Sequence, residues 1–412
     1  MLRMQYSLKD KPFVLPQFSA SPLLMISAKH LNELLSISDD KVDAYTPNAE
    51  TVAQKWTTGK DIQHGAHIDV VRRQLTRRLP LLTTDVYEEL RLAMKDVWNA
   101  SEGEWTSVNA YPTCMRIVSR AANRVFAGKE LCRNPTFIDH SREYSVAVFK
   151  CGAYMRMWPK WTHPFIAPYY TKDVKYHLAQ CKKVALPIMR KRLADIQNPP
   201  PGFNAPVDAL QWMLEDLVEL AKNDPSELDE DKMTRRLLVL NMVAIHTTSM
   251  VTTNTILDLY SSPHKDEFVE GLREEVERVM KESGGEFTKN AINSMFRIDS
   301  TIRETMRYTT LGDVALRREV IAPEGIDLSN GVHIPKGTRV ATANTAIHQD
   351  PAFYGETAAE WDGFRFSRPR EAYLAQVDQA GGDPDHLKNV LQQKNQGLIA
   401  TGEDFLSFGH GR

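Results

Sequence analysis

The segment Ala244–Ser249 (AIHTTS) places a histidine beside three consecutive hydroxyl side chains in a run that is otherwise apolar. A buried hydroxyl needs a hydrogen-bond partner, because an unpaired one costs about 1–3 kcal/mol. The hydroxyls can bond back to the carbonyls of the preceding helical turn, as Ser and Thr often do. Alternatively, the helix is kinked or opens over a cavity, and its hydroxyls face a ligand or a water chain. The residues alone leave both interpretations open.

Two further segments combine opposite charges. Glu304 and Arg307 (ETMR) are three positions apart, so on a helix they share one face and can pair. Arg365 lies between Phe364 and Phe366, and an arginine flanked by aromatics is usually held against the edge of a core. Alone, the first pair is typical of a solvated helix surface. Together with Arg365, it can close a network.

The last five residues, Phe408–Arg412 (FGHGR), predict a tight loop. Gly409 and Gly411 allow backbone conformations that other residues avoid, and they permit a close approach to a flat ligand. A glycine-rich segment is weak evidence by itself, so its meaning depends on what precedes it.

A long helix over residues 228–260 must position the hydroxyl segment. Its acidic start, Asp229–Asp231, suits the positive end of the helix dipole. The middle is apolar almost all round, so we expect this helix to run through the core. It is too polar at 246–248 and 252–254 to span a membrane. Further helices are predicted over 264–281 and 294–308, the second of which carries Glu304 and Arg307.

The rest of the chain predicts a mainly α protein with a small β region. The first 60 residues are interrupted by prolines, which indicates short strands and turns, whereas 62–192 reads as largely helical. The run QNPPPGFNAP (197–206) must be a loop. Residues 331–343 (GVHIPKGTRVATA) predict a hairpin, formed by a strand, a tight turn and a second strand. We therefore expect one domain over 1–412, whose small sheet comes from 1–60 and 311–345.

Composition narrows the class of protein. The formal net charge of the 412 residues is −2, which argues against a general nucleic-acid binder. Four cysteines without regular spacing are not a disulfide framework. No stretch approaches the length of a membrane span, and the first residues lack the apolar core of a secretory signal.

The order and spacing of these motifs resemble the cytochrome P450 family of haem-thiolate monooxygenases over nearly the whole chain. The series is a hydroxyl-rich long helix, ExxR, a DPxxYG turn at 350–355, an aromatic-flanked arginine and FGHGR. The segments RVFAGKELCRNP, HIPKGTRVATANTAIHQDP and WDGFRF are most similar to filamentous-fungal members of the ent-kaurene-oxidase-like group. Those members act on terpenoids and other secondary metabolites.

The resemblance implies roles for the polar residues. Ala244–Ser249 corresponds to the oxygen-activation segment, and Thr248 takes the place of the proton-delivering threonine. Thr247 replaces the usual acid, with His246 before it, so a relay through either residue and water is conceivable. The structural core triad, which fixes the core of the haem loop, would be Glu304, Arg307 and Arg365.

The resemblance also implies a haem-binding loop. Phe408 and Gly411 match the first two fixed positions of FxxGxxxC, and Gly409 and Arg412 lie in the same loop. The axial cysteine would fall three positions beyond Arg412, and none of the four cysteines present resembles a substitute. The thiolate pushes electron density onto the iron and favours O–O cleavage.

A haem propionate also needs cationic or polar partners. In the segment that corresponds to the family's C helix, Arg72 or His67 are candidates for this role. The tryptophan common in that segment is replaced by Ile68.

The resemblance further implies haem b, O2, an apolar substrate, and electrons from NADPH through NADPH–cytochrome P450 reductase. The segment KDKPFVLPQF looks like the proline hinge that follows a membrane anchor. An endoplasmic-reticulum membrane is thus expected for a full-length relative, whereas these residues read as cytosolic. Both ends look clipped, so the expectation is a monooxygenase or an inactive fragment of one.

Two alternatives stay open. A chain that keeps the outline of this fold without its axial cysteine can be a non-catalytic helical binding protein or a pseudogene product. A more remote alternative is a terpene synthase, because DDKVD (39–43) matches the DDxxD spacing that binds Mg²⁺ and diphosphate. That motif lies in the proline-rich early region, and NDPSELDE (223–230) is out of register with the second metal motif of those enzymes.

Overall fold

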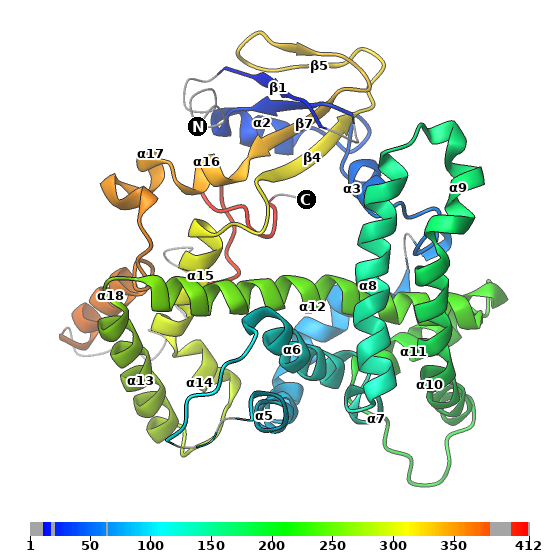
Figure 1. Ribbon diagram of the computed structural model, residues 1–412, viewed down its shortest axis with the longest axis horizontal. Coiled ribbons are helices and arrows are strands. Elements are labelled where there is room, and N and C mark those ends of the chain that lie inside the picture. Colours follow the sequence, from blue (N-terminus) through cyan, green and yellow to red (C-terminus); the bar gives the residue numbers. More distant parts are fainter. Residues whose placement is uncertain are drawn as a thin grey trace. The chain divides into compact units, whose positions relative to one another are not determined.

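The computed structural model describes residues 11–17, 21–62, 65–99, 101, 103–379 and 397–410. They form two compact units. The first, here called the sheet unit, comprises Met1–Ala49, Val251–Gly285 and Asn290–Arg412, and the second, the helical unit, comprises Glu50–Met250 and Glu286–Lys289. The described residues are mainly helical with a small β region, which confirms the predicted fold class (Figure 1).

Helices account for most of both units. Between α4 and α5 lies a π-helical segment, η3, at Val70–Leu75. In chain order the α-helices are α2 (Leu31–Ser36), α3 (Tyr45–Thr51), α4 (Ala66–Asp69), α5 (Thr76–Trp98), α6 (Ala110–Phe126), α7 (Lys129–Cys132), α8 (Pro135–Arg156), α9 (His163–Tyr170), α10 (Lys172–Gln197), α11 (Ala209–Leu220), α12 (Glu230–Ser261), α13 (Lys265–Glu282), α14 (Lys289–Asn293), α15 (Phe296–Tyr308), α16 (Asn344–His348), α17 (Pro351–Tyr354) and α18 (Arg368–Gln379).

The main sheet of the sheet unit joins strands from the two ends of the chain. Its strand order is β1-β2-β7-β4-β3. β7 lies at the centre, parallel to β2 and antiparallel to β4, and all five of its residues are buried. The strands are β1 (Phe13–Leu15), β2 (Leu23–Ile26), β3 (Val42–Asp43), β4 (Val314–Val320) and β7 (Arg339–Ala343).

The strand–turn–strand expected over 331–343 exists, but its two strands do not pair with each other. β6 (His333–Ile334) pairs instead with β5 (Ile326–Asp327) in a separate two-stranded sheet. Both edges of β7 are already occupied by β2 and β4. The turn is tied to the end of β4, since Gly337 N donates to Val320 O at 2.8 Å. The predicted hairpin pairing was therefore wrong.

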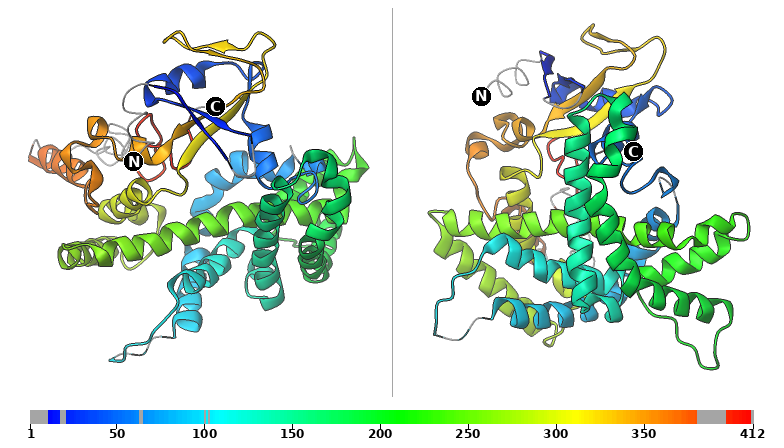
Figure 2. Two further views of the ribbon diagram at one scale, coloured as in Figure 1. Left: turned by 45° about the horizontal axis from the view of Figure 1, so that its top comes forward. Right: turned by 45° about the vertical axis from the view of Figure 1, so that its right-hand side comes forward.

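The helical unit is built around one apolar core. α8 and α10 lie side by side along much of their length, with α11 and the first part of α12 beside them (Figure 2). Buried Trp212, Met213 and Leu214 of α11 belong to this core. The proline run ends α10 at Gln197, as predicted, and Asp208 then caps α11 by accepting from Gln211 N at 2.8 Å.

A smaller aromatic cluster in the sheet unit packs α13 against the segment that contains Trp361 and Phe364. The ring of Phe268 on α13 meets Trp361 and Phe364 edge to face, at centroid distances of 5.3 and 5.0 Å. Gly271 lies one turn later, where a Cβ atom would come within 2.8 Å of the Phe364 ring. This packing places α13 and the segment around Phe364 next to α15, which carries the charged pair.

α12 does not have the composition of a membrane helix, despite its length. No helix in the described ranges combines enough length with enough apolar character to cross a bilayer.

Candidate functional site

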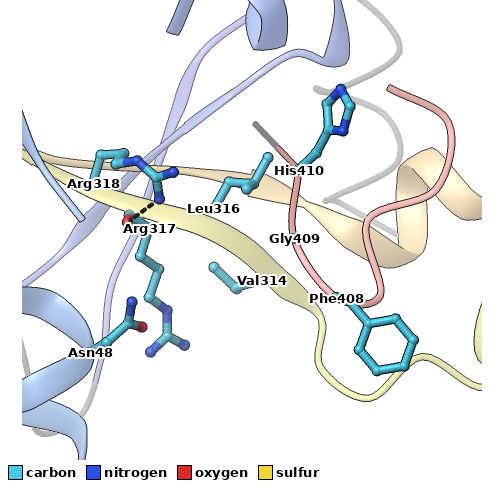
Figure 3. Close-up of a pocket in the computed structure, with 8 residues that line it drawn as sticks. All are labelled: Asn48, Val314, Leu316, Arg317, Arg318, Phe408, Gly409 and His410. Atoms are coloured by element: carbon cyan, nitrogen blue, oxygen red, sulfur yellow. Dashed lines mark hydrogen bonds between the residues drawn. The ribbon is translucent and has the colours of Figure 1, made fainter. Parts of the chain in front are cut away.

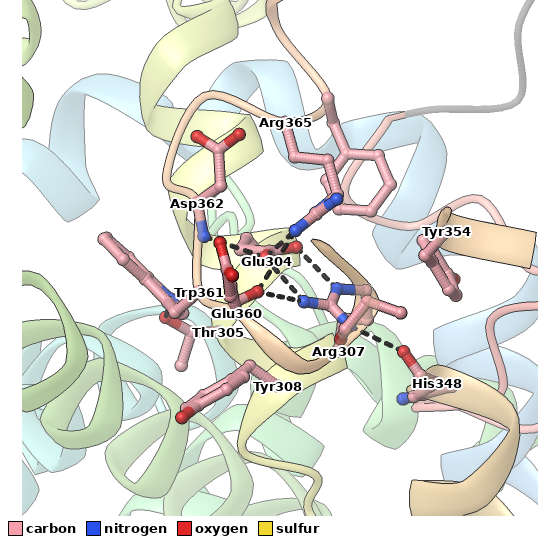
Figure 4. A network of polar contacts seen from close by, with 12 residues as sticks. Glu304, Thr305, Arg307, Tyr308, His348, Tyr354, Glu360, Trp361, Asp362 and Arg365 are labelled. Atoms are coloured by element: carbon pink, nitrogen blue, oxygen red, sulfur yellow. Dashed lines mark hydrogen bonds and ion pairs between the residues drawn. The ribbon is translucent and has the colours of Figure 1, made fainter. Parts of the chain in front are cut away.

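α15 carries a buried ion pair at the centre of the sheet unit. Glu304 and Arg307 are both fully shielded from solvent. Arg307 donates from Nε and Nη2 to the two carboxylate oxygens of Glu304, each at 2.7 Å. The remaining donors of Arg307 reach three backbone carbonyls, of His348, Ala358 and Glu360, at 2.6–2.7 Å. All five N–H donors of a guanidinium are thus used (Figure 4).

Arg365 joins this pair from a later segment of the chain. Its Nε donates to Glu304 Oε1 at 3.1 Å, and its Nη2 donates to the carbonyls of Thr357 and Glu360. The amide of Asp362 also donates to Glu304 Oε1, at 2.9 Å. The three residues predicted as a triad therefore lie together, and they fold the segment from residue 357 to 365 around one carboxylate.

Such an arrangement is stable only while it is complete. A buried charge that loses its partner costs about 3–5 kcal/mol, because no water compensates it. Here each charge of the pair is both matched and hydrogen-bonded. The network consequently fixes the positions of the backbone segments that it touches.

The same helix also holds the segment that precedes the glycine loop. Arg303 donates to the carbonyls of Gly397 and Ala400 at 2.7 and 2.6 Å, and its guanidinium lies 3.8 Å from the ring centroid of Phe405. Ser407 Oγ donates to Met306 O at 3.1 Å. Residues 397–407 are thus attached to α15 from both ends.

His348 connects the ion-pair network to the glycine loop. Its carbonyl accepts from Arg307, and its ring nitrogen Nε2 accepts from the amide of Leu406 at 2.8 Å. The ring stacks on Phe405, with centroids 5.1 Å apart and planes 7° apart. Burial first, and Arg307 second, lower the pKa of His348 to about 3, so the ring is neutral. Tyr354 adds a bond from its hydroxyl to Asp404 O at 2.7 Å.

The glycine loop borders a cavity of about 500 Å³ within the sheet unit. Phe408, Gly409 and His410 line one side, and Arg317 and Arg318 of β4 lie across from them (Figure 3). Gly409 has φ of +79°, which explains why glycine is required there. Phe408 is 57% exposed, so its ring is not part of the core. Gly411 and Arg412 lie outside the described residues.

The acidic motif at 39–43 is accounted for by Arg318 and by nearby backbone amides. Burial lowers the pKa of the Arg318 guanidinium, while Asp39 and Asp43 oppose the shift. The carboxylate of Asp43 accepts from the amides of Tyr45 and Thr46 at 2.7 and 3.2 Å. These acids therefore act as charge partners and as a cap. Within the described ranges, no three metal-binding side chains converge to hold a metal ion.

The hydroxyl segment of α12 remains a regular helix. Thr247 Oγ1 donates to Val243 O at 2.7 Å, and Ser249 Oγ donates to Ile245 O at 2.6 Å. This is the back-bonding that the sequence allowed. Thr248 is exposed, and its hydroxyl is on the opposite side of the helix from Val243.

His246 points away from those hydroxyls and towards α8. Its ring meets the ring of Phe149 edge to face, at a centroid distance of 6.2 Å. Burial first, and the charge of Arg142 second, lower the pKa of His246. Its Nε2 is buried without a hydrogen-bond partner in the described part of the chain. The structure thus separates His246 from Thr248.

The two candidate propionate partners differ in exposure. His67 is buried on α4, and its pKa falls to about 4 because of burial first and the charge of Arg236 second. Arg72 lies on the π-helical segment and is exposed. Of the two, only Arg72 carries a charge that can meet an anion at neutral pH.

The family-model comparison decides the class of protein. The model described as "Cytochrome P450" matches residues 11–394. The chain belongs to the cytochrome P450 family.

Curated relatives agree with this assignment. The chain is 38% identical to the cytochrome P450 monooxygenase gloP of Glarea lozoyensis, over 99% of this chain and 74% of that protein. It is 36% identical to htyF of Aspergillus rugulosus, over 97% of this chain and 58% of the relative, and 31% identical to olcJ of Penicillium canescens, over 95% and 68%. These relatives are fungal P450 monooxygenases, so the family membership is that of an enzyme.

A solved structure supports the P450 fold. The retinoic-acid-bound cyanobacterial CYP120A1 matches with a TM-score of 0.65 and 18% identity, over 97% of this chain and 78% of that one. At this identity the likeness concerns the fold alone.

P450 enzymes use a haem whose iron is bound by a cysteine thiolate. Each cysteine of this chain is therefore a candidate for that ligand. All four, Cys114, Cys132, Cys151 and Cys181, are buried in helices of the helical unit. Burial raises the pKa of Cys132 and Cys151 to about 11 and that of Cys181 to about 12. Thiols with such raised pKa values are protonated at neutral pH and do not fit an axial thiolate. Cys132, Cys151 and Cys181 therefore do not complete a haem site.

Sequence reasoning missed the residues that connect the triad to the loop. Arg303 and His348 were not singled out, and Tyr354 was interpreted only as part of the DPxxYG turn. The available signal was weak: Arg303 is directly next to Glu304, and His348 ends a short apolar helix. Their role depends on contacts between residues 50 or more positions apart.

Proposed function

We propose that these residues belong to a haem-dependent monooxygenase that inserts one oxygen atom into an apolar fungal secondary metabolite, such as a terpenoid. The observation that carries the proposal is the buried network of Glu304, Arg307 and Arg365, which is joined through His348 to the glycine loop. This connection uses charged residues to hold the segment directly before the loop at Phe408–His410. A cofactor loop needs such support, because a flat ligand tolerates little displacement of the backbone.

α12 carries an exposed aliphatic stripe, because Val243, Met250 and Leu257 are seven residues apart and share one side of the helix. Their exposed fractions are 62, 38 and 51%. Such a stripe suits contact with an apolar molecule better than contact with water. Thr248 lies on another side of α12, so the stripe supports an apolar ligand and not a place for it beside Thr248.

Haem, when bound, would supply the activation of O2. The protonated thiols of Cys132, Cys151 and Cys181 do not offer its thiolate. The contribution proposed for this chain is to hold a proton at Thr248 Oγ1, on the side of α12 that bears Ala244. His246 is an unsuitable member of this relay because its ring packs against Phe149. Thr247 is equally unsuitable, because its hydroxyl bonds to Val243 O.

The proposal includes partners. Electrons would come from NADPH through a cytochrome P450 reductase. A site on the endoplasmic-reticulum membrane is proposed by analogy with a full-length relative, and Arg72 is proposed as a propionate partner.

The test titrates haem into two samples. One is the 412-residue chain, and the other is the protein translated from its complete transcript. We expect the complete product to bind one haem and to show the carbon-monoxide difference spectrum of a thiolate-ligated iron. With reductase and NADPH it should then oxidise apolar terpenoids. Failure of the complete product to bind haem would contradict the proposal and favour a non-catalytic binding protein. Haem binding by the complete product alone would place the axial ligand outside these residues.

A further inference from the structure

Two histidines meet between the long antiparallel helices of the helical unit. His140 lies in the first half of α8, and His177 lies in the first half of α10. Their Nδ1 atoms are 2.9 Å apart, and their ring centroids are 5.1 Å apart with planes inclined by 43°. Both side chains are half-buried, so solvent reaches them. Neither residue belongs to the site described above.

The distance between the two nitrogens restricts what can lie between them. If both rings were protonated, two N–H groups would point at each other. One neutral ring accepting from the other satisfies the geometry, and so does one cation shared by two neutral rings. Neutral imidazole is the form that binds metals.

The separation also matches metal coordination. Two nitrogens bound at about 2.05 Å to one ion, at a right angle, lie about 2.9 Å apart. A right angle between neighbouring ligands is typical of tetragonal Cu²⁺ and Ni²⁺. A tetrahedral ion such as Zn²⁺ would require about 3.3 Å, and thus a small opening of the pair. The observed 2.9 Å is also the length of a hydrogen bond between the two rings, which a bound ion would replace.

The charges around the pair favour a cation. Glu143, one turn after His140, and Asp173, one turn before His177, place two carboxylates electrostatically close to His177. The nearby guanidinium of Arg142 is engaged by Asp139 at 3.3 Å and by Glu143 at 3.1 Å.

We propose that His140 and His177 form a binding site for a divalent transition metal, Cu²⁺ or Ni²⁺, that links α8 to α10. Within the described ranges no third histidine, cysteine or carboxylate converges on the pair. Water therefore completes the coordination sphere, and the site is open. Since the ligands come from two helices, the ion opposes their separation. This inference is independent of the proposed monooxygenase activity.

The first experiment measures Ni²⁺ binding to the 412-residue chain by equilibrium dialysis and by the thermal unfolding midpoint. We expect Ni²⁺ to raise the midpoint and EDTA to reverse the rise. His140→Ala and His177→Ala should each weaken Ni²⁺ binding at least tenfold, because each removes one of two protein ligands. The matched control is His163→Ala, which removes a histidine from α9 in the same unit and should change binding less than twofold.

Two results would overturn the site. The first is a Ni²⁺ affinity of His140→Ala or His177→Ala that equals the wild-type affinity. The second is a wild-type thermal unfolding midpoint that millimolar Ni²⁺ leaves unchanged. If a variant fails to fold, the wild-type chain with Cu²⁺ gives a second measurement by electron paramagnetic resonance. Two equivalent nitrogens bound to copper would support the site. One nitrogen, or none, would mean that the pair is only a hydrogen bond between two imidazoles.

Discussion

The ion-pair network of α15 and the hydroxyl segment of α12 both place polar side chains in helices that pack against apolar neighbours, but their polar groups are satisfied differently. Around Glu304 every donor of Arg307 has a partner, and the partners come from distant segments of the chain. In α12, Thr247 and Ser249 each donate to a carbonyl of the preceding turn of their own helix. The bonds of the network therefore join distant segments, whereas these two bonds stay within α12.

This difference indicates a division of labour. A side chain that bonds within its own helix can be changed at little cost to the fold, so its position is free for chemistry. A side chain that joins several segments is needed for the fold itself. The substitutions below test this contrast, in order of decreasing effect on stability.

The largest loss of stability is expected from Glu304→Gln. The amide keeps the shape of the side chain but leaves Arg307 as an uncompensated buried charge, at a cost of about 3–5 kcal/mol. Urea unfolding at pH 7 measures this loss in the free energy of unfolding. The control is Glu274→Gln on α13. The Glu274 side chain is 65% exposed and pairs with Arg297. Its substitution should lower the free energy of unfolding by only about 0.2–1 kcal/mol. Equal effects of the two substitutions would contradict the assigned importance of the network.

An intermediate loss is expected from Arg365→Lys. Lysine keeps the charge but loses the planar fork that reaches Glu304, Thr357 and Glu360 together. We expect a loss of about 1–3 kcal/mol, since buried acceptors are left unpaired. Arg368→Lys is the matched comparison, because Arg368 is 53% exposed and pairs with Asp362 at the surface. The expectation fails if both variants unfold at the same urea concentration.

The pH dependence of stability probes His348. Its folded pKa of about 3 lies below the ordinary value near 6.5, so the unfolded state binds more protons between these values. This contribution to stability is complete above pH 6.5 and is lost as the pH falls, by at most about 1.4 kcal/mol per pH unit. His348→Asn should be less stable at pH 7 but flatter between pH 6.5 and 4.5. An unchanged slope, or an equal change in exposed His333→Asn, would argue against a neutral buried His348.

The smallest change in stability is expected from Thr248→Ala, within about 1 kcal/mol, because the side chain is exposed. In the complete, haem-loaded protein this variant should nevertheless uncouple NADPH consumption from product formation, by about tenfold or more, because positioned proton transfer contributes about 10²–10⁴-fold. Thr247→Ala is the control, since that hydroxyl is engaged by Val243 O. Unchanged coupling in Thr248→Ala would remove this residue from the proposed relay.

The sequence predicted features that depend on local pattern. The apolar run with an acidic start indicated the helix seen at α12, and the proline run indicated the loop before α11. The ExxR spacing placed Glu304 and Arg307 on one helical face, where they pair. Each of these follows from residues within a few positions of one another.

Features that depend on the choice of a distant partner could not be predicted in this way. The alternation in β6 and β7 indicates strands but not their neighbours, so the expected hairpin was wrong. The surface-pair interpretation of Glu304 and Arg307 missed their burial, which comes from segments 40 to 60 residues later. The pair of His140 and His177 also arises only when α8 and α10 pack together.

The central claim is that the ion-pair network holds the segment before the glycine loop. Amide hydrogen exchange of residues 397–407 in Arg307→Lys tests it most directly, with exposed Arg278→Lys as control and α13 as the reference for global unfolding. The account predicts faster exchange in this segment, including the Leu406 amide that donates to His348, while α13 stays protected in both variants. Wild-type exchange rates at 397–407 in Arg307→Lys would contradict it.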